Sequence, residues 1–152
     1  MTTDYITLYA NALKVVAEKV VGLQSVFDPP PPKIDSAQLP ALYILTGGTD
    51  SEDITDNNFI ATSRMYRVQV AVMPIGQGNP YSRETIARPL IENVKSVFRK
   101  YPSLGGAQGV QSMKVVNDSG IVILPEYGMK FIGFEVTLRI ISVIPREYAT
   151  GE

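Results

Sequence analysis

The 152-residue sequence contains no histidine, no cysteine and no tryptophan. Histidine is the commonest general acid or base, because its unperturbed charge changes near neutral pH. Without imidazole or thiol groups, the histidine-assisted serine and cysteine mechanisms and the zinc sites built on these ligands are excluded. Any catalysis would have to use carboxylates, lysine, tyrosine or bound Mg²⁺. We therefore expect a protein that is not an enzyme and that acts through its shape and surface.

Excess charge and long apolar runs are lacking as well. The formal net charge is −1, which gives no basic surface for gripping nucleic acid. No apolar run approaches the ~20 residues that cross a bilayer, and the first residues lack the basic segment of a secretory signal. The absence of cysteine fits a reducing compartment. We expect a protein that is made in a cytoplasm, does not contact a membrane, and needs no metal, cofactor or disulfide.

The hydrophobic pattern predicts a single domain of the α+β class over residues 1–152. Apolar residues at helical spacing indicate helices, and alternating apolar and polar residues indicate strands. The expected elements are helices over 3–21, capped by Thr2 or Thr3 and ended by Gly22, and over 82–101; strands over 41–45, 60–73 and 131–143; and a hairpin of 110–116 with 121–124. We expect a mainly antiparallel sheet of about four to five strands, with both helices packed on one face.

Proline punctuates the chain in three places. The run from Pro29 to Pro32 is stiff and cannot pair in a sheet, so 29–38 is a predicted linker; the alternative is a ligand for a proline-binding domain. Pro89 lies inside the second helix, where it either kinks the helix or begins a shorter one. We favour the kink. Pro145 ends the last strand, and 145–152 is a predicted short tail.

A polar segment at 49–58, which follows Gly47 and Gly48, is predicted to be a loop. It carries four acidic residues: Asp50, Glu52, Asp53 and Asp56. The segment has neither the central glycine nor the terminal glutamate of a helix–loop–helix calcium site, so we expect a solvated loop and no bound metal. The alternative from a different functional class is a small carboxylate- or Mg²⁺-dependent enzyme that uses these acids.

The two longest strands each have a face that is not part of the core. Alternation places Arg67 and Gln69 on this face of one strand, and Glu135 and Arg139 on this face of the other. Such mixed polar faces either contact water or contact another subunit. These four residues are therefore candidates for a subunit interface.

The order of elements resembles the tail terminator family of long-tailed bacteriophages, together with related tail-completion and neck proteins. An amphipathic helix opens the chain, and a proline-led strand follows at 39–44. A long strand that ends in proline, 64–74, precedes the second helix. A hairpin and a long closing strand, 131–143, complete the pattern. The resemblance covers nearly the whole chain and is one of architecture.

The resemblance implies a virion structural protein at the junction of tail and neck. Members of this family form a ring, usually of six copies, on the head-proximal end of the tail tube. The ring stops tube polymerisation and binds the head connector, and double-stranded DNA passes through it without sequence-specific contacts. No catalytic step or cofactor is involved. In such a ring, the acidic segment would line the lumen, where it repels phosphates, or face a partner. The alternative assignment is a head-completion, adaptor or other neck protein.

Overall fold

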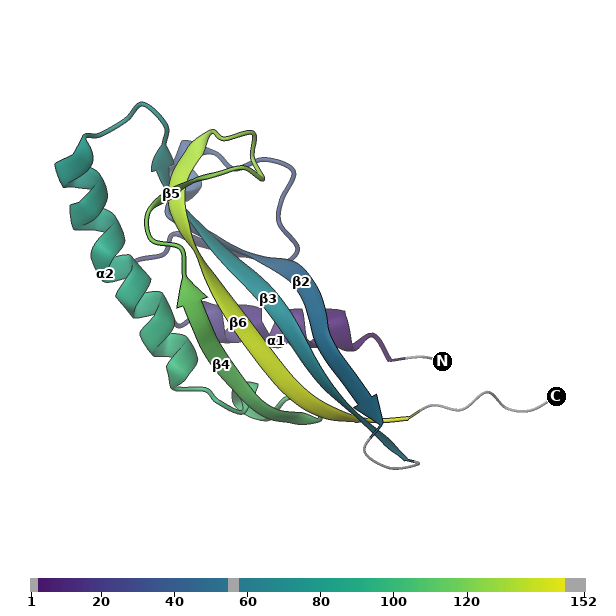
Figure 1. Cartoon of the computed structure of the whole chain (residues 1–152). Coiled ribbons are helices and arrows are strands. Elements are labelled where there is room, and N and C mark those ends of the chain that lie inside the picture. Colours follow the sequence, from purple (N-terminus) through teal and green to yellow (C-terminus); the bar gives the residue numbers. More distant parts are fainter. Residues whose placement is uncertain (1–2, 55–57, 147–152) are drawn as a thin grey trace.

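The computed structural model describes residues 3–54 and 58–146, and in these ranges it has the predicted α+β fold (Figure 1). The helices are α1 (Tyr5–Ala17) and α2 (Pro80–Arg99), with short 3-10 turns η1 (Ser36–Gln38) and η2 (Leu104–Gly106). The strands are β1 (Ser25–Phe27), β2 (Ala41–Ile54), β3 (Phe59–Pro74), β4 (Val110–Asp118), β5 (Val122–Leu124) and β6 (Phe131–Pro145). The sheet has six strands, so the expectation of four to five is wrong. The unpredicted strand, β1, spans three residues, which is too few to show a periodicity.

The strands follow the order β1-β2-β3-β6-β4, and β5 also pairs with β6. All pairs are antiparallel except β1 with β2. The predicted hairpin is wrong, because β4 and β5 do not pair with each other. β4 lies along 136–142 of β6 and β5 along 131–133, so the turn between them moves the chain along one edge of β6. A strand as long as β6 offers both segments more backbone partners than a three-residue hairpin would.

Both helices begin at a polar cap. The side chain of Asp4 accepts a hydrogen bond of 3.0 Å from the Thr7 amide, so Asp4, not Thr3, caps α1. α1 ends at Ala17, one turn before the predicted stop at Gly22. The side chain of Asn79 caps α2 by accepting a hydrogen bond from the Ser82 amide, so α2 begins at Pro80, two residues before the predicted start. α2 continues through Pro89, so a shorter helix beginning at Pro89 is wrong.

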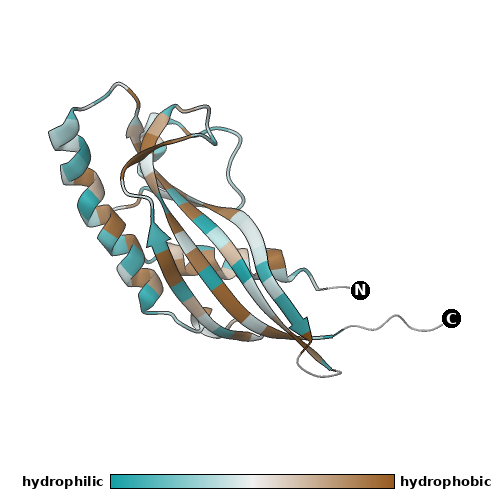
Figure 2. Cartoon of the chain, viewed as in Figure 1, coloured by the Kyte–Doolittle hydropathy of each residue, from teal (hydrophilic) through white to brown (hydrophobic). Residues whose placement is uncertain are grey.

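The main core lies between the sheet and the two helices, which pack on the same face as predicted. Figure 2 shows apolar and polar residues alternating along the central strands. The apolar rows predicted for β3 and β6 point inward: the fully or almost fully buried members are Tyr66, Val68, Val70, Phe134, Val136, Leu138 and Ile140. They meet Leu13 of α1 and Phe98 of α2. Burial of these rows is the main stabilising contribution to the fold.

The acidic segment is not a loop as far as Ile54. β2 continues through it and pairs with β3 up to the pair Ile54–Ile60, so Asp50, Glu52 and Asp53 lie on a strand. Two register shifts, between Thr46 and Ser51, absorb the glycines that had suggested a stop. A Cβ on Gly47 would lie 2.8 Å from the Met65 carbonyl oxygen, so glycine permits the close approach of β2 to β3 here. Asp56 lies outside the described residues.

The proline-rich linker packs on the second face of the sheet. The Tyr127 hydroxyl donates a 2.7 Å hydrogen bond to the Pro31 carbonyl, and Ile34 is buried beside Tyr43 and Leu124. The predicted tail lies outside the described residues from 147 onward. No helix of the described segments is long and apolar enough to cross a membrane.

Candidate assembly surface

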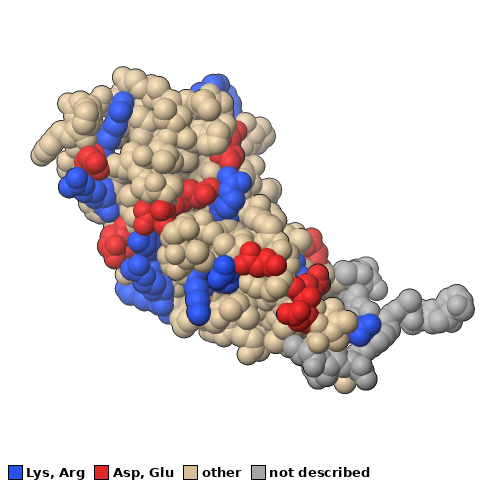
Figure 3. Space-filling model, viewed as in Figure 1, with Lys and Arg blue, Asp and Glu red and all other residues tan. Residues whose placement is uncertain are grey.

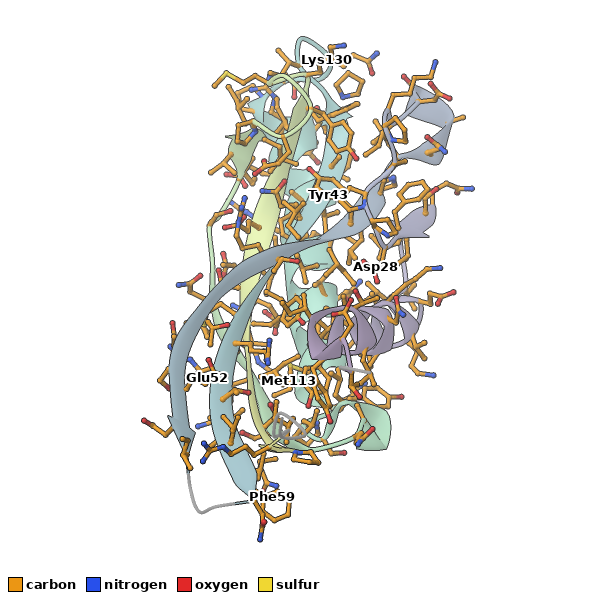
Figure 4. All side chains as sticks on the ribbon, turned by 90° about the vertical axis from the view of Figure 1, so that its right-hand side faces the viewer. Asp28, Tyr43, Glu52, Phe59, Met113 and Lys130 are labelled. Atoms are coloured by element: carbon orange, nitrogen blue, oxygen red, sulfur yellow. The ribbon has the colours of Figure 1, made fainter. Side chains whose placement is uncertain are left out.

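The sheet face opposite the helices, called here the outer face, is only partly covered. Towards the end of the sheet that carries Tyr43, the linker and the β5–β6 turn cover it with a small apolar cluster that includes Ile34, Tyr43 and Phe131. Figure 4 shows β2 running from Tyr43 to Glu52 away from α1. Around this lower part, outer-face residues such as Met65 and Ile141 are only half-buried. The lower outer face is thus a mixed apolar and polar surface that the described chain leaves uncovered.

A polar network marks the border of the covered region and joins three of the four predicted interface residues. Gln69 accepts a hydrogen bond of 2.7 Å from the Tyr43 hydroxyl, and its amide nitrogen donates one of 2.9 Å to Glu135. Arg67 donates from Nε to Glu135 at 2.8 Å and forms a second ion pair with Glu126. Gln69 is only 2% exposed. It therefore has an internal role and is not available to a neighbouring subunit.

The network shifts the acidity of its members. Burial is the largest single effect on Glu126 and would raise its pKa, but the hydrogen bonds to this carboxylate, chiefly from Arg67, and the charge of Arg67 together outweigh burial and lower the pKa below its usual value. The hydrogen bond to Glu135 raises the pKa of Arg67, so Arg67 stays charged. Burial raises the pKa of Tyr43, which therefore remains a neutral donor. The network holds the turn that carries Glu126 against the sheet.

We predict that Arg67→Met lowers the free energy of unfolding by about 1–2 kcal/mol at pH 7, a range reduced for partial exposure. Because the folded-state pKa of Glu126 is depressed, its ion pair stabilises the fold above the unfolded-state pKa, and this contribution is lost as pH falls through the folded-state value. The difference between variant and wild type should therefore shrink in acid. Urea unfolding at pH 7 and in acid measures both effects.

The control for this experiment is Arg88→Met, because Arg88 pairs with Glu84 on the exposed surface of α2. Exposed pairs contribute about 0–1 kcal/mol, so the control should change stability little at either pH. An Arg67→Met variant that behaves like this control would contradict the structural role of the network.

The fourth predicted interface residue, Arg139, lies lower on the outer face. Its guanidinium contacts Asp50 at 2.9 Å and so connects β6 to β2 across β3. The strand register places Arg139 between Met65 and Lys114. Lys114 is exposed and forms no ion pair with any described residue. One basic side chain here is neutralised within the chain and the other is not.

The described sheet has an unpaired edge on each side. β1 pairs only with 41–43, so the described part of β2 beyond Tyr43 has no strand on the side away from β3. β4 likewise has no described strand on the side away from β6. Glu52 and Asp53 are exposed near the end of the β2 edge, and Lys114 is exposed on β4. Figure 3 shows acidic side chains gathered near the β2 end of the molecule and basic ones on the α2–β4 side. The two edges therefore differ in charge.

A separate groove of about 580 Å³ opens beside the start of α1. Its lining is mostly apolar and includes Ile6, Ile60 and Ile144, together with Arg64. The Nε atom of Arg64 is buried and has no hydrogen-bond partner among the described residues. Asp4 also lines the groove, so the chain itself already supplies a carboxylate there.

The described residues contain no group of three or more acidic residues close enough to hold a metal ion. Asp50 binds Arg139, whereas Glu52 and Asp53 remain exposed on the strand. Sequence reasoning missed Lys114, Glu126 and the Arg64 groove. Lys114 could have been found from its strand register with Arg139. Glu126 lies in a turn, and no sequence pattern links it to Arg67.

A scan against models of protein families found no match. A search of curated proteins found none either.

Proposed function

We propose that this chain is a virion structural protein that forms a ring on the head-proximal end of a bacteriophage tail tube. The ring would end tube polymerisation and join the tail to the head connector. The observation that supports this proposal is the uncovered lower outer face, bordered by two unpaired and oppositely charged sheet edges. A sheet surface left open in this way is suited to contact with other protein chains.

A closed ring requires a head-to-tail contact, in which two different surfaces of the same chain meet. The β2 and β4 edges lie at opposite sides of the sheet and differ in charge, so they meet this requirement. The partners would be further copies of the chain, six in a ring of the usual size for this family, and the tail tube and head connector proteins. Double-stranded DNA would pass through the lumen without sequence-specific contacts.

The acidic residues would either line the lumen of the ring or face a partner protein, and their position on a strand supports the second arrangement. Glu52 and Asp53 lie on an unpaired strand edge, which is a surface that other strands bind. A lumen lining would instead suit a solvated loop, and the described part of the acidic segment is a strand. The proposal therefore assigns these two residues to contact between protein chains.

The tube-length distribution tests the proposed function. Tail tube subunits from the phage that encodes this protein are polymerised with and without the purified chain, and lengths are measured by electron microscopy. A terminator shortens the tubes and stops their growth at substoichiometric ratios to tube subunits. Unchanged lengths, with binding to the head connector alone, would reject the terminator role and favour another neck protein.

A further inference from the structure

We infer that neighbouring copies of this chain join edge to edge. The free edge of β2, on the side away from β3, would lie against the free edge of β4, on the side away from β6, in the next copy. This inference rests on the proposed ring and specifies how its subunits would meet. The occupant of each edge is thus a second copy of the same chain.

The first argument is the pairing left open by the sheet. Among the described residues, β2 has no strand partner over 44–54 on the side away from β3, and β4 has none on the side away from β6. Part of the β4 edge is already used, because the Met113 amide donates a 2.7 Å hydrogen bond to the Pro102 carbonyl. The free part of β4 is therefore 114–118. Unpaired edges present amide and carbonyl groups that readily accept another strand.

The second argument is charge. Glu52 and Asp53 on the β2 edge have no ion pair with a described residue, and neither does Lys114 on the β4 edge. Lys114 also lies directly across from Arg139, and like charges in opposed positions are destabilising. Asp50 neutralises Arg139 only. Asp53 lies opposite Ala61 and, like Lys114, on the outer face, whereas Glu52 lies opposite the buried Thr62 and faces the helix side. Asp53 of a second copy would therefore supply the counter-charge that Lys114 lacks.

The third argument is the exclusion of symmetric pairing. Two β2 edges brought together would bring the acidic residues of both copies close to each other, and two β4 edges would bring two copies of Lys114 close to each other. The mixed contact instead brings Asp53 of one copy towards Lys114 of the next. A mixed contact leaves one free edge of each kind at the ends of the assembly, so subunits add until rotation closes a ring.

Cysteine cross-linking tests the contact directly, since the chain has no native cysteine. The double variant Asp53→Cys, Lys114→Cys, whose two positions both lie on the outer face, is oxidised mildly at the highest concentration that the protein tolerates, with and without tail tubes. Disulfides form only where Cα atoms come within about 7 Å, so the inferred contact gives a ladder of covalent oligomers that stops at the ring size. Each single variant should give dimers at most.

The matched control is Arg88→Cys, Lys114→Cys, which moves one cysteine to the exposed face of α2 and should give no ladder. A double variant with cysteines at 53 and 114 that yields nothing above the dimer in both conditions would overturn the inference. A ladder without shortened tubes would keep this contact and reject the terminator role. Shortened tubes without a ladder would keep the terminator role and reject this contact.

Discussion

Gly133→Ala is expected to lower the free energy of unfolding by at least about 3 kcal/mol, or to prevent folding altogether. A Cβ at this position would lie 1.8 Å from the carbonyl oxygen of Val70 and 2.9 Å from a methyl carbon of Leu124. The carbonyl belongs to β3, which is held between β2 and β6, so the clash cannot be relieved by a side-chain rotation. The two central strands would have to separate at this point.

Urea unfolding followed by circular dichroism measures this effect, and Gly48→Ala is the matched control. A Cβ on Gly48 meets nothing within 4 Å, so this variant should stay within about 0.5 kcal/mol of the wild type. Both glycines lie in strands, which makes the space around Cβ the main difference between them. Equal stabilities for the two variants would contradict the close approach of β6 to β3.

Reversing the charges of one sheet edge is expected to weaken self-association by about tenfold or more. In the variant Glu52→Lys, Asp53→Lys, the new lysine at position 53 would share the outer face with Lys114 of the next copy, and Lys114→Glu would place an acid near Asp53. Each exposed ion pair contributes only about 0–1 kcal/mol, but charge reversal both removes the attraction and adds repulsion. A tenfold change in the association constant corresponds to about 1.4 kcal/mol, which the two effects together can supply. Combining all three substitutions in one chain makes the edges complementary again and should restore association.

Sedimentation velocity over a range of protein concentrations measures the self-association. High salt should weaken the association of the wild type, because it screens the charges of the edges. Arg88→Glu is the control, because it reverses an exposed charge on α2, away from both edges. Restoration by the triple variant distinguishes edge pairing from a general effect of net charge. If the triple variant associates no better than the two partial ones, the charges of these edges do not set the contact.

The long elements were predictable from the sequence because burial repeats within them. Alternation along β3 and β6 assigned the inward rows correctly, and helical spacing located both helices to within a turn. These signals are strong because one face of each element contacts the core. The placement of both helices on one face of the sheet also followed from the order of elements.

Pairing between distant segments was less predictable. The acidic part of β2 has a composition typical of loops, yet it forms a strand because β3 provides a continuous backbone partner. β4 and β5 look like a hairpin locally, but each finds β6 instead. In both cases a tertiary partner outweighs local propensity, and the sequence pattern carries no information about that partner.

The candidate site divides in the same way. Alternation placed Arg67, Gln69, Glu135 and Arg139 on the outer face, and the structure puts all four there. It did not predict that Gln69 is buried or that Arg67 binds Glu126, because the covering turn and linker have no periodic signal. The use of the outer face by another subunit stays a prediction.

Imaging of tail tubes incubated with this protein tests the proposed function most directly. If the proposal is correct, negative-stain electron microscopy should show ring-shaped density on one end of each tube, with none along its length. The end that is covered should be the one that binds the head connector. Decoration along the tube, or no binding to either end, would contradict the proposal that this chain terminates the tail.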